Sequence, residues 1–441
     1  MVNSMYLTWP FHPPTHMTPE EREIWWEQCY LSTPADGVLA EMPAWTIITG
    51  APGSGKSVTL AALARRESNH AFIIPYPLEK WPGSPQAWIK DNPSHLAQMM
   101  ACAAFKVRDY LSQHHQSVPM LPEWQQEFVR WLLEKTGGGR AYHRWLHGLP
   151  VDMRESWQGI EYIDLFPSTS DALDIQGQID ELTTLAQTLG FQRVLFTIDV
   201  PYQEGYGCVQ PLADLYRLLE LAHHPRFTIV SAIPLPVLQQ GDIVRLARGR
   251  VSVLHLEWTV EQGHMLAARY LSTAVTRDFD VSLAEYAQPQ LLASMSQVIA
   301  NEYGQPTPAG WIGMVETLLY LAYQPGDRSL PFTSDDLTEV KRVFYARHLP
   351  IKPDLDARGV WRGPRFIALD EQPLGFLNLL YRRQGNPANW DDEDVRFLAG
   401  SKGNVHTLAA RIRKAIEPVP RHPIYLVNRR GEGGYWLENV V

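Results

Sequence analysis

The stretch Gly50-Ala51-Pro52-Gly53-Ser54-Gly55-Lys56-Ser57 matches the pattern G-x-x-x-x-G-K-[ST] at every defined position. An apolar run over residues 45–49 precedes it, and residues 57–66 read as a helix. Glycines let the backbone turn successive N–H groups inward, and a helix N-terminus favours anionic phosphates. The stretch therefore predicts a strand, a phosphate-binding loop and a helix. The alternative is a glycine-rich turn without a ligand.

The polar positions of this loop have distinct expected roles. Lys56 would reach the β- and γ-phosphates, and the Ser57 hydroxyl would bind Mg²⁺. We therefore expect ATP or ADP and Mg²⁺ as cofactors. The expected nucleotide contacts are Gly50, Gly53, Ser54, Gly55, Lys56, Ser57 and Val58.

The composition is that of a globular chain with two or three domains, since it has 441 residues, 45% hydrophobic and 20% charged. No apolar run approaches the length of about eighteen residues that spans a bilayer, and the start lacks a signal pattern. We therefore expect a cytoplasmic protein that does not enter a membrane. The formal charge of −9 argues against general coating of nucleic acid. Residues 341–441 are nevertheless locally basic, with 17 Lys and Arg against 11 Asp and Glu.

Further apolar runs predict the other strands of a parallel sheet, at residues 71–75, 193–199, 227–231 and 251–256. A helical pattern over residues 94–150 predicts an insertion between strands. Asp199 ends the run 193–199, and a carboxylate there, downstream of a phosphate loop, would hold Mg²⁺ through water beside Ser57. An aspartate that only starts a turn is the alternative.

These features resemble the P-loop ATPases of the AAA+ and STAND (signal-transduction ATPase) families. The resemblance implies that Ser231, at a strand end, senses the γ-phosphate. It also implies that Arg248 or Arg250 reaches the nucleotide of a neighbouring subunit. A serine that ends a strand and a surface arginine cluster would look the same without these roles.

One departure from the AAA+ pattern bears on hydrolysis. That family usually places a glutamate directly after the aspartate, where this chain has Val200 and then Pro201. The nearest acid is Glu204, which is a candidate general base or a solvated loop carboxylate. The departure predicts slow hydrolysis.

Residues 260–271, 282–304 and 309–323 have helical patterns and resemble the helical lid of these ATPases. Gly304-Gln-Pro306 is similar to the G-x-P lid motif of STAND proteins, with Thr307 in place of an arginine. The expected domains are an N-terminal helical lead-in at 1–44, a nucleotide-binding domain at 45–259, a lid and connector at 260–350 and a winged-helix domain at 351–441.

The C-terminal pattern changes to short strands at 357–363 and 365–369, helices at 373–383, 391–400 and 404–417, and two strands within 425–437. In the third helix one stripe is apolar and is expected to be buried. It consists of Val405, Leu408, Ile412 and Ile416. This leaves Thr407, Arg411 and Lys414 to face outward.

This segment resembles the winged helix-turn-helix domain of OmpR/PhoB-type response regulators. Arg411-Ile-Arg413-Lys414-Ala-Ile416-Glu417-Pro418 is similar to that family's R-x-R-K-x-L-E-P. Tyr425 to Tyr435 is similar to Y-x-x-x-x-R-G-x-G-Y, with one extra residue. The resemblance implies a third helix in the major groove and a wing on the backbone. The implied DNA contacts are Lys402, Thr407, Arg411, Lys414, Arg429 and Arg430. Winged helices of STAND ATPases act instead as intramolecular switches, which is the alternative.

The expected fold class is therefore α/β, a P-loop parallel sheet with a helical lid, followed by a winged helix-turn-helix domain. The expected function is that of a regulatory ATPase that switches conformation or assembles into a homo-oligomer with ATP. It would contact duplex DNA and act with partner proteins, in a transcription, transposition or defence system. The alternative is a nucleotide-dependent protein-interaction switch with no DNA role. The missing acid after Asp199 disfavours an active motor.

Overall fold

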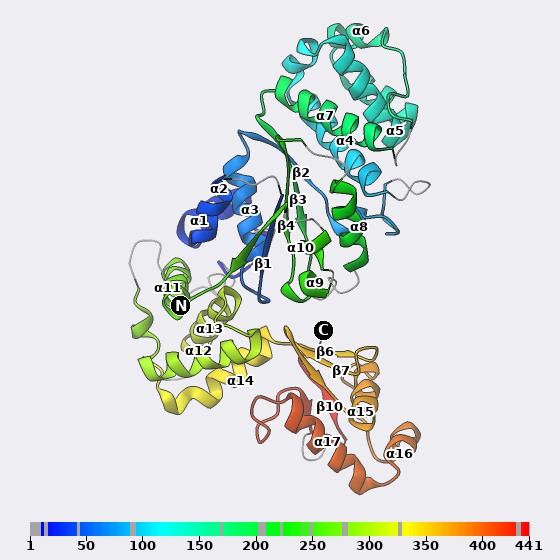
Figure 1. The fold of residues 1–441 in the computed structure, drawn as a ribbon. Coiled ribbons are helices and arrows are strands. Elements are labelled where there is room, and N and C mark those ends of the chain that lie inside the picture. Colours follow the sequence, from blue (N-terminus) through cyan, green and yellow to red (C-terminus); the bar gives the residue numbers. More distant parts are fainter. Residues whose placement is uncertain are drawn as a thin grey trace. The chain divides into compact units, whose positions relative to one another are not determined.

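The computed structural model describes residues 10–12, 16–41, 45–88, 94–167, 171–201, 209–220, 224–240, 242–246, 250–275, 281–324, 329–428 and 434–440 (Figure 1). The chain divides into two compact units. The sheet unit comprises Ser32–Gly50 and Gly55–Leu256. The C-terminal unit comprises Met1–Leu31, Ala51–Ser54 and Glu257–Val441.

A five-stranded parallel sheet forms the centre of the sheet unit, in the order β2-β3-β4-β1-β5. The strands are β1 (Trp45–Gly50), β2 (Ala71–Pro75), β3 (Arg193–Asp199), β4 (Phe227–Ala232) and β5 (Val251–Leu256). The predicted parallel α/β sheet is thus confirmed. Since all strands run in one direction, their carboxyl ends meet at one edge, where the stretch 50–57 begins.

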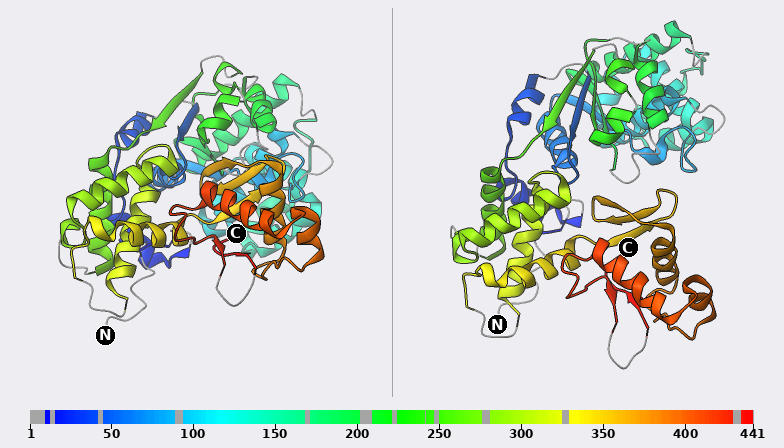
Figure 2. Two further views of the ribbon diagram at one scale, coloured as in Figure 1. Left: turned by 90° about the horizontal axis from the view of Figure 1, so that it is seen from below. Right: turned by 60° about the horizontal axis from the view of Figure 1, so that its bottom comes forward.

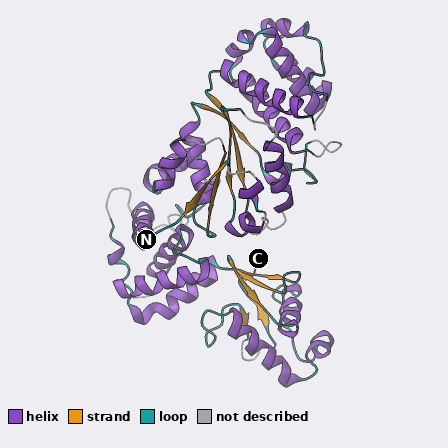
Figure 3. Ribbon diagram, in the orientation of Figure 1, coloured by secondary structure: helices purple, strands orange, loops and turns teal. Residues whose placement is uncertain are grey.

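Helices cover both faces of this sheet (Figures 2 and 3). On one face, Ile48 and Leu195 share a core with α2 (Pro34–Glu41) and α3 (Lys56–Glu67). The opposite face carries Ile47, Phe72 and Phe196, which pack with α4 (His95–Gln113), α7 (Ala172–Thr188) and α8 (Val209–Glu220). Burial on both faces explains why these strands read as continuous apolar runs.

The predicted helical insertion lies between β2 and β3. It contains α4, α5 (Glu123–Gly148) and α6 (Val151–Gln158), followed by α7. The long helix α5 is interrupted at Gly138, which has a φ of 72° that favours glycine. Two short helices, α9 (Leu235–Gln240) and α10 (Ile243–Leu246), connect β4 to β5.

The C-terminal unit begins with α1 (Pro19–Gln28), and its helical part continues with α11 (Val260–Val275), α12 (Pro289–Tyr303), α13 (Pro308–Ala322) and α14 (Leu337–His348). The prediction of one helix over 282–304 is wrong at its start. Ser282 and Glu285 form a capping box that closes a separate short turn. The helix then begins at Pro289, because the fixed φ and missing N–H of proline suit a first helical position. Within the described residues, no helix is long and apolar enough to cross a membrane.

The C-terminal module, residues 351–440, places three antiparallel strands before three helices and a two-stranded hairpin. Its elements are β6 (Ile351–Asp354), β7 (Gly359–Arg362), β8 (Arg365–Ala368), α15 (Glu371–Arg382), α16 (Glu393–Ala399), α17 (Lys402–Ile416), β9 (Leu426–Val427) and β10 (Trp436–Leu437). The apolar stripe predicted for the third helix is buried in α17, which confirms that part of the pattern.

A buried ion pair joins this module to α12. Arg362 on β7 donates from Nε and Nη2 to the two carboxylate oxygens of Glu302, at 3.0 and 2.6 Å. Its Nη1 donates to the backbone oxygen of Ile416, the last residue of α17, at 2.7 Å. Both charged side chains are almost fully buried, at 6% and 2% exposure. The end of α17 is thus connected to α12 through one guanidinium group.

Candidate nucleotide-binding site

The loop after β1 has the backbone conformation that its glycines predict. Gly53 and Gly55 have φ values of 69° and 92°, in the left-handed region that favours glycine. Ser54 N–H donates to the Ala51 oxygen at 3.2 Å, which closes a tight turn. Gly55 caps α3, so the helix begins at Lys56, directly after the loop. The N-terminal end of the α3 dipole therefore lies at the loop.

Lys56 is buried and extends back across the loop, where its Nζ donates to the Gly50 oxygen at 3.2 Å. Burial lowers the pKa of Lys56 to about 8, because it disfavours the ammonium form, while the Asp199 carboxylate opposes this shift. A lysine held in this way gains a strong electrostatic partner when a phosphate enters the loop.

Asp199 at the carboxyl end of β3 lies with Ser57 at the start of α3. Burial raises the pKa of Asp199, while a hydrogen bond with the Ser57 side chain and the charge of Lys56 lower it. The structure therefore brings together the carboxylate and hydroxyl that were predicted from separate parts of the sequence. Oxygen ligands of this kind suit Mg²⁺, which binds proteins through one or two side chains and water.

Two hydroxyl groups beside the loop support the fit to a polar ligand. Thr49 Oγ1 and Ser54 Oγ are both buried and have no hydrogen-bond partner within the described chain. Buried hydroxyls normally have a partner, so phosphate oxygens or ordered water suit these positions. With Lys56, Ser57 and Asp199, the residues present fit a nucleoside polyphosphate with Mg²⁺.

The remaining candidates from the sequence have different surroundings. Ser231 is fully buried one residue before the end of β4, where its Oγ accepts from Tyr216 Oη at 3.1 Å. Arg250 is exposed at the amino end of β5, the end opposite Leu256, which pairs with Gly50. It is therefore remote from the loop within one chain. Glu204 and Arg248 lie outside the described residues, and the roles of all four residues stay predictions.

The sequence patterns missed two groups that hold the loop from outside. Trp258, which follows β5, donates its indole Nε1–H to the Ser54 oxygen at 2.9 Å. Ala309, in the first turn of α13, donates its N–H to the Gly53 oxygen at 3.2 Å. A side chain at Gly53 would meet both α12 and α13, because a Cβ there would lie 3.2 Å from Cε1 of Tyr303 and 2.7 Å from Ala309 Cβ.

Thr307 occupies the position at which the resemblance to the STAND lid motif led us to expect an arginine. It is fully buried, and its Oγ1 accepts from Gly310 N–H at the start of α13. Its role in the structure is thus to cap the helix that supplies Ala309.

An aromatic residue just beyond a strand end was visible in the sequence at Trp258, but its position beside the loop depends on the strand order.

The predicted DNA contacts on α17 fall into two groups. Lys402, Thr407 and Lys414 are exposed. Neither lysine forms an ion pair within the described part of the chain. Arg411 is half-exposed but pairs with Asp370, which precedes α15. Arg429 and Arg430 lie outside the described residues.

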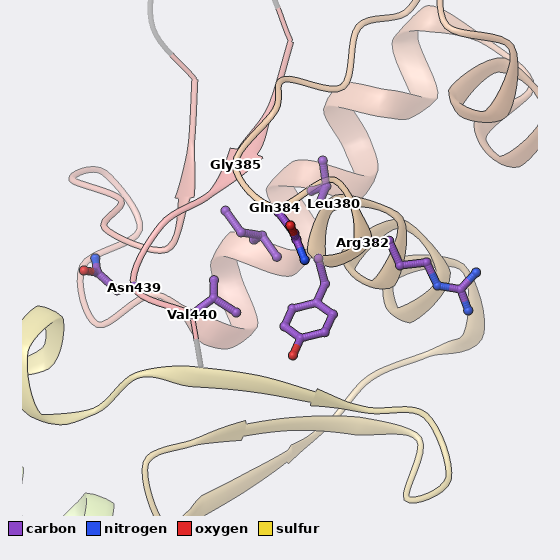
Figure 4. A pocket seen from close by; sticks show the side chains of 8 residues that line it. Leu380, Arg382, Gln384, Gly385, Asn439 and Val440 are labelled. Carbon is purple, nitrogen blue, oxygen red and sulfur yellow. The ribbon is translucent and has the colours of Figure 1, made fainter.

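A pocket of about 660 Å³ lies elsewhere on the C-terminal module (Figure 4). It is lined by Leu380, Tyr381, Arg382, Gln384, Gly385, Leu437, Asn439 and Val440. Among the described residues, none of the predicted DNA contacts on α17 lines this pocket, so the exposed face of α17 is a separate surface.

The parallel sheet, the glycine loop, Lys56 and the carboxylate at the end of β3 together have the arrangement of a P-loop domain. No protein-family model and no curated relative matches the sequence. A solved structure of Cdc6p from Pyrobaculum aerophilum matches 100% of this chain and 94% of its own, with 11% sequence identity and a TM-score of 0.38. Similarity at this level carries no argument about fold or activity, so the assignment rests on the geometry of the loop.

Proposed function

We propose that this protein is an ATP-binding regulatory ATPase of the AAA+/STAND type that switches conformation or assembles with ATP. The single observation that carries the proposal is the buried Lys56 beside a glycine loop, where the hydroxyls of Thr49 and Ser54 are buried without a hydrogen-bond partner in the described chain. A buried ammonium next to unpartnered polar groups is stabilised by an anionic ligand with many acceptor oxygens. Arg248 and Arg250 are the proposed contacts to a neighbouring subunit.

Calorimetric titration of ATP with Mg²⁺ tests this proposal. Loss of the charge-assisted bonds from Lys56 in Lys56→Ala should weaken ATP binding by about 2–4 kcal/mol, roughly 30- to 1000-fold. Lys106→Ala removes an exposed lysine from α4 and serves as the control. Equal ATP affinity in both variants would show that the loop does not bind the nucleotide.

Hydrolysis by the isolated protein is proposed to be slow. Val200 is buried directly after Asp199, so no carboxylate occupies the position next to the proposed magnesium ligand. General-base assistance contributes about 10²–10⁴-fold, and Glu204 is the proposed source. We expect turnover below about 1 s⁻¹, lowered further by Glu204→Gln. Fast turnover that survives this substitution would place the base elsewhere.

We further propose that the C-terminal module is a winged helix that contacts duplex DNA and acts with partner proteins. The order of three strands, three helices and a hairpin supports this, as do the exposed lysines of α17. The second candidate, a protein-interaction switch, is favoured by the pairing of Arg411 with Asp370, which reduces the free positive charge. Titration of a duplex over a range of salt, with ATP or ADP, separates the two. Absence of binding at low salt would favour the switch.

A further inference from the structure

The segment between β5 and α11 carries a contact that the nucleotide motif does not include. Trp258 Nε1 donates to the Ser54 carbonyl of the phosphate loop, at 2.9 Å. We propose that Trp258 is a positioning residue, which holds this carbonyl outward so that the Gly55 amide faces the phosphates. The inference rests on the nucleotide binding proposed above and adds a residue outside the motif.

The planarity of the peptide group determines the direction of the Gly55 N–H. A trans peptide is planar, and its C=O and N–H point in opposite directions. The Ser54 carbonyl and the Gly55 N–H belong to one such plane. Since the indole N–H binds the carbonyl, the Gly55 N–H must point away from Trp258, and we call the side that faces Trp258 and Ala309 the outer side of the loop.

The preceding peptide shows the same relation. Its carbonyl, on Gly53, accepts from Ala309 N–H on the outer side at 3.2 Å. Its N–H, on Ser54, points inward and reaches the Ala51 oxygen at 3.2 Å. Two successive carbonyls are therefore bound by donors of the C-terminal unit, to which residues 51–54 themselves belong. Backbone N–H groups on the inner side of such a loop bind the α- and β-phosphates.

The position of Trp258 is itself fixed by the start of α11. Thr259 N–H donates to Gln262 Oε1 at 3.0 Å, and Gln262 N–H donates to Thr259 Oγ1 at 3.2 Å. This reciprocal capping box sets the direction in which the chain enters the helix. Trp258 is the residue directly before it, so its backbone has little freedom.

The Trp258 indole and the Ala309 N–H are also held in place relative to each other. Gly263 of α11 packs so closely against α13 that a Cβ there would lie 2.0 Å from Trp311 Nε1. Trp258 directly precedes the cap of α11, and Ala309 lies in the first turn of α13, so the close packing of these two helices fixes the two donors relative to each other. The loop therefore meets a pre-organised pair of donors.

The test compares Trp258→Phe with wild type and with Trp124→Phe, a control at a tryptophan that is 45% exposed on α5. Phenylalanine keeps an aromatic ring but removes the N–H. Two ligands are measured: ATP directly, and inorganic pyrophosphate by displacement of a fluorescent ATP analogue. Loss of one hydrogen bond that orients a phosphate donor should weaken both ligands by the same factor, about 3- to 10-fold.

Each result has one meaning. An equal loss for ATP and pyrophosphate in Trp258→Phe, absent from Trp124→Phe, supports the proposal. Unchanged ATP affinity overturns the proposal. Weaker ATP binding with unchanged pyrophosphate binding also overturns it and would place Trp258 at the adenine of ATP. If wild type binds no ATP, the proposed function itself fails. Should Trp258→Phe not fold, Trp258→Leu removes the donor at this partly exposed site without adding another, and the same criteria apply.

Discussion

The loop at residues 50–57 and the helix α17 both matched a sequence motif, but only the motif of the loop determines the conformation of the main chain. Gly53 and Gly55 adopt the left-handed conformations that the motif requires. The basic positions of α17 act through side chains, and one of them, Arg411, pairs with Asp370. A motif that works through main-chain geometry therefore specifies its site more completely than one that works through exposed charges.

The largest expected effect concerns the support of α17. Arg362→Ala should lower the free energy of unfolding by about 3–5 kcal/mol, because it leaves the Glu302 carboxylate buried without its main partner. Arg365 contacts the same carboxylate at 3.2 Å but is 48% exposed, so Arg365→Ala should cost within about 1 kcal/mol. Urea denaturation followed by tryptophan fluorescence measures both. Equal losses would contradict the dependence on burial.

An intermediate effect concerns the charge state of the loop. Burial lowers the pKa of Lys56 to about 8, and a bound polyphosphate favours the ammonium form and so raises that pKa in the complex. ATP affinity should therefore be full below about pH 8 and fall above it, by roughly tenfold between pH 7 and 9. Titration in buffers of different ionisation enthalpy should show proton uptake near pH 8. A pH-independent affinity in wild type would contradict this, and Lys56→Ala should lack the slope.

The smallest expected effect concerns the ion pair of Arg411 on α17 and its influence on DNA binding. Asp370→Ala releases Arg411 from its ion pair and should steepen the dependence of log DNA affinity on log salt by about 0.9. Lys414→Ala should flatten it by a similar amount. Arg382→Ala, at the separate pocket, serves as the control. If Asp370→Ala and Arg382→Ala behave alike, α17 does not face the duplex.

The sheet was predictable because its strands are buried on both faces. The bounds of β2, β3 and β5 coincide with the apolar runs 71–75, 193–199 and 251–256. The strand order was not readable, since the parallel pairing of β2 with β3 closes across a long helical insertion that leaves no local pattern in either strand. The neighbours of the loop depend on that order, which is why Lys56 and Ser57 could be named from sequence and Trp258 could not.

The same distinction holds in the C-terminal module. The buried stripe of α17 follows from helical periodicity alone. The pairing of Arg411 with Asp370 joins residues 41 positions apart, and the pairing of Arg362 with Glu302 joins residues 60 apart. Contacts over such separations depend on the packing of whole elements and leave no local pattern.

Adjacent positions of α12 have different attachments: Glu302 binds the buried Arg362, and Tyr303 lies against Gly53. Fraying of this one helical turn would release both attachments at once. The last turn of α12, the loop residues 51–54 and β7 should therefore open as one cooperative unit, with similar protection of their amides against hydrogen exchange. A ligand that orders the loop would then slow exchange in β7 as well.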